Sequence, residues 1–394
     1  MTALAERYRV IDTDTHVIEP VDLWTSRVSS TRKDDVPHVE FDPTWNVQRW
    51  RLGDRWLNPV GYYSAAGWPE HVPSYPPTLD EANPAGHNAH ERLKIMDEYG
   101  LYAQVLYPNI IGFESQMFAD MQDQRLALEC VRAYNDFLTD FASADPKRLL
   151  PITMLPFWDV DATVQEMTRC REAGHAGALW AAKLHVLGYP RINNRHWDRV
   201  YAAAQDLEVS LNLHIGLGAF TNDDMAFMSL NRENFHVGAY VVDSAVSFSS
   251  NMHTIGTLLV SDVFERFPRL QVVSVESGFG YVPYLLESLD WQWKNSAGPT
   301  KYPSRRLPSE KFFDNVWATF WFENQTLRLL ESLPQYADRL MFETDFPHTT
   351  SLSPGPASSS PRPSELIEQS VGNLDPAIAK KILQDNARRL YHIK

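Results

Sequence analysis

The sequence VIDTDTHVIEP, residues 10–20, combines the composition of a buried strand with three chemically reactive side chains. Side chains two positions apart on a strand point to the same face, so Asp12, Asp14 and His16 share one side of this strand. In a closed barrel, that side is either the interior or the surface beneath the helices. A strand that gathers two acids and an imidazole on one face indicates a polar site at its carboxyl end.

Eight apolar runs rich in β-branched residues recur along the chain, with helical patterns between them. The runs are YRVIDTDTH (8–16), YAQVLYPN (102–109), LLPITMLP (149–156), GALWAAK (177–183), VSLNLHIG (209–216), LQVVSVES (270–277), NVWATFWF (315–322) and RLMFETDF (339–346). Helical spacing of apolar residues is clearest in 122–143, 161–173, 197–207 and 281–294. Alternating strands and helices, with uniform composition throughout, predict one α/β domain over residues 1–394, a (β/α)8 TIM barrel. An open doubly wound sheet is the alternative.

Two long segments interrupt this alternation. Residues 17–89 are rich in Trp, Pro and Tyr and separate the first strand from its helix, and we interpret them as a cap over the barrel mouth. We expect the tryptophans of this segment to form the cap's own small core: Trp45, Trp50, Trp56 and Trp68. The sequence SLSPGPASSSPRPSE (351–365) predicts an irregular, mobile loop. Near the end of the chain, Asp375 followed by Pro376 predicts the start of the last helix.

The charge and cysteine content exclude several classes of protein. A net charge of -14 and the lack of a Lys/Arg run argue against nucleic-acid and anionic-membrane partners. Cys130 and Cys170 are the only cysteines, so they cannot build a disulfide framework or a thiolate metal cluster. The N-terminus resembles no signal peptide, and no run reaches the roughly 20 apolar residues of a membrane helix. We expect a cytoplasmic protein that acts on a small molecule.

Three further strands end in residues that commonly bind metals: His214, Glu276 and Asp345. The carboxyl ends of barrel strands share one mouth, so these residues are expected to meet Asp14 and His16 there. Carboxylates gathered in a dry pocket repel one another unless a cation neutralises them. Oxygen and imidazole ligands without thiolates favour Zn, Mn or Fe. We therefore predict that these five residues bind a divalent metal, with Asp345 and Glu276 also acting in proton transfer.

Other polar residues near the strand ends are predicted to support this site. Asp12 and Glu343 share the inward direction but lie one layer deeper, as expected for buried partners of the ligands. Tyr107 and Asn109 follow the second strand, and Lys183 follows the fourth. Lys183 would suit either a substrate carboxylate or one of the surplus acids.

Five motifs in this order resemble one enzyme family over nearly the whole chain. They are DTDTHVIEP (12–20), MDEYGLYAQVLYPN (96–109), HWDRVYAAAQDLEVSLNLHIG (196–216), FPRLQVVSVESGFGYVPYLLESLD (267–290) and LMFETDFPH (340–348). With them the chain resembles the amidohydrolase superfamily, in its branch of aminocarboxymuconate semialdehyde and resorcylate-type decarboxylases. The resemblance implies a (β/α)8 fold with a metal held by Asp14, His16, His214 and Asp345. It also implies a homodimer, because dimers are frequent in this family.

The sequence departs from the family pattern at two places. The first-strand pair is often His-x-His or Glu-x-His in the family, whereas this chain has Asp14 and His16. The decarboxylases carry a catalytic His at the end of strand six, where this chain has Glu276. A carboxylate there can act as an acid or base, or it can bind a second metal. Possible additional ligands for a second metal are His253, His348 and Glu19.

Three functions remain open from these residues. The leading interpretation is a metal-dependent hydrolase or non-oxidative decarboxylase acting on a small organic carboxylate, a class that includes aromatic ones. The second is a dinuclear Fe or Fe/Mn oxygenase that hydroxylates a C–H bond on the same fold. The third is a catalytically silent barrel that serves as a subunit.

Overall fold

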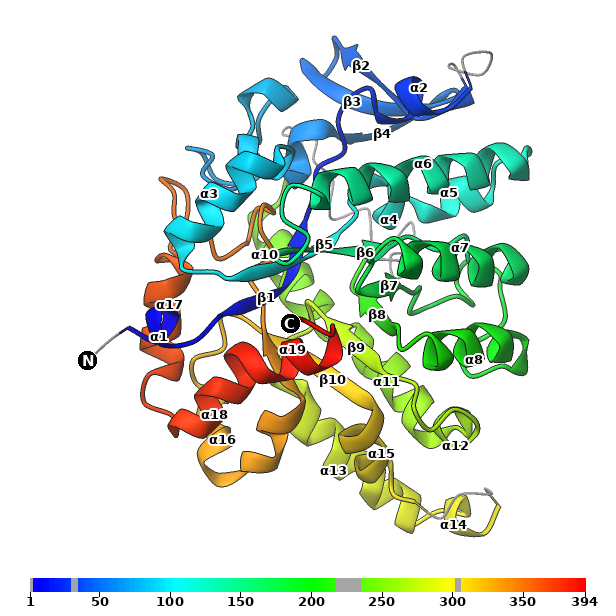
Figure 1. Cartoon of the computed structure of the whole chain (residues 1–394), viewed down its shortest axis with the longest axis vertical. Helices are drawn as coiled ribbons and strands as arrows, with labels where there is room; N and C mark the ends of the chain where they lie inside the picture. The colour runs from blue at the N-terminus through cyan, green and yellow to red at the C-terminus, as the bar shows by residue number, and fades with distance from the viewer. Residues whose placement is uncertain (1–2, 30–34, 217–234, 302–305) are drawn as a thin grey trace.

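The computed structural model describes residues 3–29, 35–216, 235–301 and 306–394. One sheet of eight parallel strands lies at its centre, in the order β1-β5-β6-β7-β8-β9-β10-β11 (Figure 1). The strands are β1 (Ile11–His16), β5 (Ala103–Tyr107), β6 (Leu149–Thr153), β7 (Gly177–Leu179), β8 (Ser210–His214), β9 (Val272–Val275), β10 (Val316–Phe320) and β11 (Leu340–Phe342). Each of the eight falls within one of the predicted apolar runs. Nearly every strand residue is buried, because helices cover the outer face and side chains fill the interior.

The first and last strands meet just beyond the end of β11. The backbone N–H of Asp345 donates to the carbonyl of Asp14 at 2.9 Å, and that of His16 donates to the carbonyl of Phe346 at 2.6 Å. A parallel bridge joins Thr15 to Phe346. These contacts join the two edges of the sheet, which confirms the predicted barrel over the open-sheet alternative. They also place two of the predicted ligands, Asp14 and Asp345, side by side.

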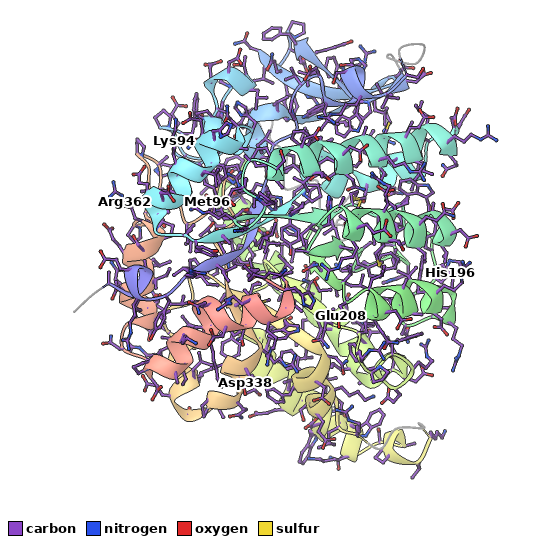
Figure 2. The ribbon with its side chains drawn as sticks, in the orientation of Figure 1. Lys94, Met96, His196, Glu208, Asp338 and Arg362 are labelled. Carbon is purple, nitrogen blue, oxygen red and sulfur yellow. The ribbon has the colours of Figure 1, made fainter. Side chains whose placement is uncertain are left out.

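Helices surround the sheet, and three of the main ones begin at a side chain that caps the first turn. The main ones are α3 (Ala89–Tyr99), α6 (Gln124–Ala142), α7 (Val160–Glu172), α8 (Asp198–Asp206), α11 (Asn251–Val260), α13 (Tyr281–Lys294), α15 (Pro308–Asn315) and α17 (Pro363–Val371). The carboxylates of Asp123 and Asp159 accept backbone N–H groups at the starts of α6 and α7. On α3, Met96 is buried and Lys94 is exposed, which shows the amphipathic packing of this layer (Figure 2).

Shorter helical segments connect these elements. They are α1 (Leu4–Arg7), α4 (Ile110–Phe113), α5 (Ser115–Ala119), η5 (Arg195–Trp197), α10 (Val237–Ser247), α12 (Val263–Arg266), α14 (Gly298–Lys301), η6 (Thr326–Arg328), α16 (Leu329–Ser332) and η7 (Pro334–Arg339). At the C-terminus, α18 (Pro376–Lys380), a π-helical turn (Lys381–Asp385) and α19 (Asn386–Leu390) follow Asp375. Its carboxylate accepts the N–H of Ala377 at 2.7 Å, as the sequence predicted.

The segment between β1 and α3 folds into a small unit of its own. It contains α2 (Leu23–Arg27), the antiparallel strands β2 (His38–Asp42), β3 (Val47–Leu52) and β4 (Arg55–Pro59), and the short turns η2 (Val60–Tyr63), η3 (Leu79–Glu81) and η4 (Pro84–Gly86). The buried rings of Trp24 and Trp50 meet edge to face at 5.2 Å. Trp45 and Trp56 pack against the guanidinium of Arg49. Trp50 belongs to the main hydrophobic core together with barrel residues, Trp45 borders a small cluster of Val47 and Tyr75, and Trp56 is 38% exposed. The predicted tryptophans therefore do not share one separate core of the insertion.

Several other predictions can be compared with the structure. Residues 351–362 are irregular up to the start of α17, although Ser351, Leu352 and Ser353 are buried, and the mobility of this loop stays a prediction. Cys130 and Cys170 are buried free thiols. Among the described helices, none combines the length and apolar character needed to cross a bilayer.

Candidate metal centre and active site

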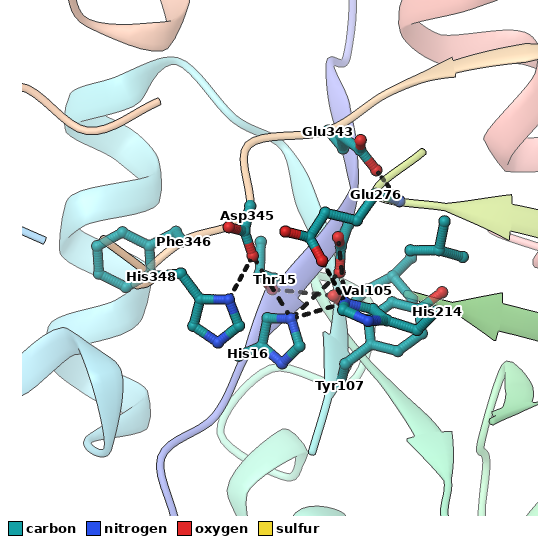
Figure 3. Close-up of polar contacts among 12 residues, drawn as sticks. Thr15, His16, Val105, Tyr107, His214, Glu276, Glu343, Asp345, Phe346 and His348 are labelled. Atoms are coloured by element: carbon teal, nitrogen blue, oxygen red, sulfur yellow. Dashed lines mark hydrogen bonds and ion pairs between the residues drawn. The ribbon is translucent and has the colours of Figure 1, made fainter. Parts of the chain in front are cut away.

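The predicted ligands converge at the carboxyl end of the barrel (Figure 3). The Nε2 atom of His16 lies 3.6 Å from Asp14 Oδ1, 3.5 Å from Asp345 Oδ1 and 3.0 Å from the Nε2 atom of His214. The Nε2 atom of His214 lies 3.5 Å from Asp14 Oδ2 and 3.6 Å from Glu276 Oε2. Five side chains from β1 and from the ends of β8, β9 and β11 thus enclose one small volume.

The backbone fixes which nitrogen of each histidine faces the centre. The Nδ1 atom of His16 donates to the carbonyl of Pro108 at 2.9 Å, and that of His214 donates to the carbonyl of Ile215 at 2.6 Å. With Nδ1 occupied by the proton, each neutral ring directs the lone pair of Nε2 toward the other. Two such lone pairs 3.0 Å apart repel unless a proton or a cation lies between them. Anchoring of Nδ1 by a carbonyl is also how proteins orient metal-binding histidines.

Two carboxylates of this cluster, those of Asp14 and Asp345, lack hydrogen-bond partners. Both oxygens of Asp14 and both oxygens of Asp345 are buried without a hydrogen bond. An unpaired buried carboxylate is costly, so four such oxygens beside two imidazole nitrogens call for a positive charge. Asp14, His16 and His214 offer ligand atoms that lie within 4.8 Å of one another, as do Asp14, Glu276 and Asp345. The donor set fits a divalent cation of the Zn, Mn or Fe type.

The pKa values in the metal-free chain show the same imbalance of charge. Burial, together with the charges of Glu276 and Asp14, raises the pKa of Asp345 well above its usual range. Burial raises the pKa of Glu276 to about 8, against the opposing effect of His214. For His214, burial lowers the pKa, but the carboxylates of Asp14 and Glu276 outweigh it and raise the pKa to about 9. Without a metal, the cluster retains protons to reduce its negative charge.

Two of the site residues adopt backbone conformations that side chains rarely take. Glu276 has φ +54° and directly follows β9. Asp345 has φ +59° and lies three residues after the end of β11. For non-glycine residues this left-handed region costs on the order of 1 kcal/mol or more. Hydrogen bonds hold both residues in place: Asp345 N–H donates to Asp14 O, and Glu276 N–H donates to the carboxylate of Glu343 at 3.2 Å. The turns aim both carboxylates into the mouth.

Asp12 and Glu343 lie beneath the cluster, where the sequence placed them. Asp12 accepts the N–H and hydroxyl of Thr344, at 2.9 and 2.7 Å, and the amide of Gln104 at 3.0 Å. Glu343 accepts from the backbone of Glu276. Neither belongs to the groups whose atoms are close enough to share a metal. Their contacts position the residues on either side of the β1–β11 junction.

His348 joins the cluster from the loop after β11. Its ring stacks on that of His16, with centroids 3.9 Å apart and planes at 24°. The Nε2 atom donates to Asn109 Oδ1 at 2.7 Å, because the amide of Asn109 itself donates to Val17 O. The Nδ1 atom therefore faces Asp345 Oδ1 at 2.7 Å with either a proton or a metal-binding lone pair. His16, Asp345 and His348 form a third group with metal-ligand spacing.

The structure does not bring two other predicted residues, His253 and Glu19, into the cluster. His253 is exposed on α11, because the buried positions Asn251, Thr254 and Ile255 define the opposite side of that helix. Glu19 is buried, but it accepts the N–H of Asn109 at 3.1 Å and belongs to no group with metal-ligand spacing.

Two of the residues considered for substrate contact also lie outside the pocket that opens onto the cluster. Lys183 is half-buried after β7 and does not line this pocket. The ring of Tyr107 lies beside those of His16 and His214, but its hydroxyl donates to Asn212 inside the barrel at 3.1 Å.

A cavity of about 570 Å³ leads from the surface to the cluster. Glu276, Asp345 and His348 line its floor together with aromatic residues that the sequence analysis missed. Phe113 stacks on Tyr63 with ring centroids 5.1 Å apart and planes at 7°. The remaining lining residues include Tyr62, Arg55 and Asn58 from the insertion, Glu114, Gln116 and Asp120 after β5, and Tyr240 and Phe248. The adjacent Tyr62 and Tyr63 in the long insertion were the one sequence feature that could have indicated this aromatic lining.

The fold and the sequence agree with a known family. A model of the Amidohydrolase family matches residues 11–393. The chain belongs to this family. The gamma-resorcylate decarboxylase of Rhizobium sp. (strain MTP-10005) is 27% identical to it over 267 residues, which cover 65% of this chain and 76% of the relative. The predicted superfamily and its resorcylate-type branch are thus confirmed, and the chain is an enzyme of this superfamily.

Solved structures show the same fold. An amidohydrolase from Mycobacterium avium subsp. paratuberculosis K-10 superposes with a TM-score of 0.73 at 21% identity, over 98% of this chain and 99% of the other. A dihydroxybenzoic acid decarboxylase from Polaromonas sp. JS666, with bound manganese and the inhibitor 2-nitroresorcinol, gives a TM-score of 0.58 at 20% identity. The match covers 98% of this chain and 97% of the other.

The first test concerns the assignment of the ligands. We expect His214→Ala to lose most of its bound divalent metal, because His214 supplies the imidazole from β8 that faces Asp14. Metal content after dialysis, measured by inductively coupled plasma mass spectrometry, gives the answer. His253→Ala is the matched control and should keep the wild-type content. Full metal content in His214→Ala would contradict the assignment.

The second test follows from the pKa shifts in the metal-free chain. Glu276, Asp12 and Glu19 have pKa values raised to about 8, 7 and 7, and His214 has one raised to about 9. Each binds its proton more tightly in the folded than in the unfolded chain, so stability is lost as pH rises through these values. We expect the Tm of metal-free protein to fall by about 5 °C or more between pH 6.5 and 9.

Metal-loaded protein provides the comparison, because a bound cation offsets the charge of Glu276 and its neighbours without protons. Its Tm should vary less over the same pH interval when both forms are followed by differential scanning fluorimetry. A Tm of the metal-free protein that is constant or rises toward pH 9 would refute the electrostatic interpretation.

Proposed function

We propose that the protein is a metal-dependent, non-oxidative decarboxylase of a small aromatic carboxylate. The proposal depends on one observation: a group of candidate metal ligands and an aromatic wall line the same cavity. Its floor consists of acids and imidazoles that require a cation, and its wall is formed by the parallel rings of Phe113 and Tyr63. The decarboxylases among its relatives support the reaction class, because resorcylates are aromatic carboxylates.

The aromatic wall lies within reach of the cluster. The ring of Phe113 has its centroid 5.8 Å from that of His16 and 5.5 Å from that of His214. A planar substrate ring placed against Phe113 therefore has its carboxylate near the ligand atoms. The cavity of about 570 Å³ falls in the usual range for small-molecule sites and is large enough for a substituted benzene ring.

The bound metal would supply a positive charge that orients the substrate's oxygens and offsets negative charge during the reaction. Asp14, His16, His214 and Asp345 would hold it, and manganese is our first candidate because a structural neighbour was solved with that ion. Non-oxidative decarboxylation breaks the bond between the ring and the carboxylate, adds one proton to the ring carbon and releases CO₂. The pair of electrons of the broken bond stays with the ring and takes up the proton.

Glu276 is the proposed proton donor. It lines the cavity at the end of β9, and its left-handed backbone aims the carboxyl group toward the cluster. It lies at the end of the sixth strand of the barrel, β9, where the family's decarboxylases carry a histidine. Asp345, whose oxygen lies 2.7 Å from His348 Nδ1, can relay a proton from the cavity side to replace the one transferred.

The overlap of the ligand groups favours a second candidate function. Asp345 belongs both to the group with His16 and His348 and to the group with Asp14 and Glu276. Six potential ligands in overlapping groups suit two metals as well as one. A dinuclear Fe or Fe/Mn oxygenase acting on a C–H bond is therefore the alternative. Both candidates use the same pocket, and the enzymatic relatives favour either of them over a catalytically silent subunit.

A homodimer is the proposed assembly. Helix α10 exposes four apolar side chains, with exposed fractions of 57–63% for Val237, Val241, Val242 and Val246. Exposed apolar groups concentrated on one helix are typical of an interaction surface rather than of free solvent exposure. A second copy of the chain is the proposed partner, since homodimers with twofold symmetry are the commonest assemblies of soluble enzymes.

The decarboxylase proposal is tested by CO₂ release from 2,6-dihydroxybenzoate and related hydroxybenzoates, with the Mn-loaded protein. We expect turnover without O₂ and a loss of about 100-fold or more in kcat for Glu276→Gln, with metal content unchanged. Asp120→Asn, at the exposed rim of the same cavity, should stay within about threefold of wild type. Two equivalents of Fe per chain and O₂ consumption would overturn the proposal in favour of the oxygenase.

The proposed assembly is tested by sedimentation velocity. We expect a dimer for the wild-type protein and a monomer for Val241→Glu, because a buried carboxylate at this surface has no partner. Val186→Glu, at an exposed position outside α10, should remain dimeric. A monomeric wild-type protein would contradict the proposal, and so would a dimeric Val241→Glu.

A further inference from the structure

A second cavity lies at the opposite end of the barrel from the metal cluster. Its volume is about 320 Å³, and it is lined at the starts of neighbouring strands by Ser210 of β8, Gln271 before β9, Trp317 of β10 and Arg339 before β11. Arg389 of α19, His392 and Arg269 complete its basic lining. Figure 2 shows Glu208 and Asp338, which flank this region, on the face of the molecule turned to the viewer. Nothing in the proposed reaction uses this end.

Two guanidinium groups of this cavity share one aromatic ring. The Cζ atom of Arg339 lies 4.5 Å from the ring centroid of Trp317, and that of Arg389 lies 4.7 Å from it. Trp317 is buried, and its indole N–H donates to the side-chain oxygen of Gln271 at 2.8 Å. The same oxygen accepts from Arg339 at 3.3 Å. Both cations are therefore held against one buried ring.

Neither arginine is in direct contact with a carboxylate of the described residues, although Asp314 and Asp338 act on Arg339 from a greater distance. Within the described residues, neither Arg339 nor Arg389 forms an ion pair, and Arg389 donates instead to the backbone carbonyl of Asp338 at 3.0 Å. The nearby acids have other partners: Asp338 pairs with Lys381 and Asp314 with Arg306.

The remaining charged groups of the lining are also paired. Glu208 lies 4.0 Å from His392, and Arg269 pairs with Asp206 at 2.7 Å. Burial and the charge of Arg389 lower the pKa of Arg339 to about 10, which is the electrostatic consequence of placing like charges together.

We propose that this cavity is an anion-binding site for a small molecule that carries a phosphate or carboxylate group. Two adjacent guanidinium groups present the planar donors that such oxyanions bind best. Leu390 and Val209 also line the cavity and give it apolar walls beside the arginines.

The site would be linked to the metal cluster through the barrel itself. The strands that begin at this cavity end at the cluster: β8 leads from Ser210 to His214, and β11 leads from Leu340 toward Asp345. A ligand that stiffens the starts of these strands stabilises the whole fold by binding only the native state. The test therefore measures binding and stability rather than turnover, so that its outcome is independent of the proposed reaction.

Thermal unfolding of the metal-loaded protein provides the measurement, with sodium chloride exchanged for sodium phosphate at constant ionic strength and pH 7.5. For the wild type we expect a saturable rise in Tm of about 2 °C. Arg339→Gln and Arg389→Gln should each lose at least half of this rise. The matched control is Arg362→Gln, an exposed arginine paired with Glu98 on a different part of the surface, which should retain it.

Calorimetric titrations with inorganic phosphate, phenyl phosphate and benzoate distinguish the sources of the anion. Tighter arginine-dependent binding of phenyl phosphate than of phosphate would assign a ligand with an apolar body. Equal binding would assign a free oxyanion. The proposal fails if the wild type shows no saturable rise in Tm, or if Arg339→Gln, Arg389→Gln and Arg362→Gln all show the same rise.

Discussion

The structure depends on a concentration of negative charge that the protein cannot neutralise by itself. Asp14 and Asp345 are joined through the backbone hydrogen bond that closes the barrel, so their carboxylates cannot separate without opening it. Their four oxygens are buried without hydrogen bonds. In a medium of low polarity, such groups are stable only with protons or a cation beside them. Closing the barrel therefore also brings together the carboxylates that need a metal.

Much of this arrangement follows from the sequence because strands have a fixed period. The alternation in β1 and the polar residues at the ends of β8, β9 and β11 place acids and imidazoles at one end of a parallel barrel, whatever the details of packing. His253 lies outside the cluster, and its neighbours in the sequence give no such period by inspection. The helix phase that turns it outward is set by Asn251, Thr254 and Ile255, of which two are polar residues buried by tertiary contacts.

The aromatic wall could not be predicted for a different reason. Phe113 lies in a four-residue helix after β5, and Tyr63 lies in a short turn of the insertion. Their parallel contact joins segments that are fifty residues apart in sequence, and no local pattern encodes it. The arginines over Trp317 are similar, since Arg339 and Arg389 come from different elements. Sequence periodicity specifies where strand residues point, whereas irregular segments acquire their positions from packing.

The charge balance of the cluster connects the number of metals to the reaction. Asp14, Glu276 and Asp345 carry three negative charges when ionised, and His16 and His214 are neutral ligands. One divalent cation leaves one negative charge, which a single retained proton removes. Glu276 is the natural place for that proton, since it lines the cavity and burial raises its pKa. A second divalent cation would displace the proton and turn Glu276 into a ligand. A strand-six glutamate therefore suits proton transfer with one metal and oxygen chemistry with two, which is why metal stoichiometry decides between the two functions.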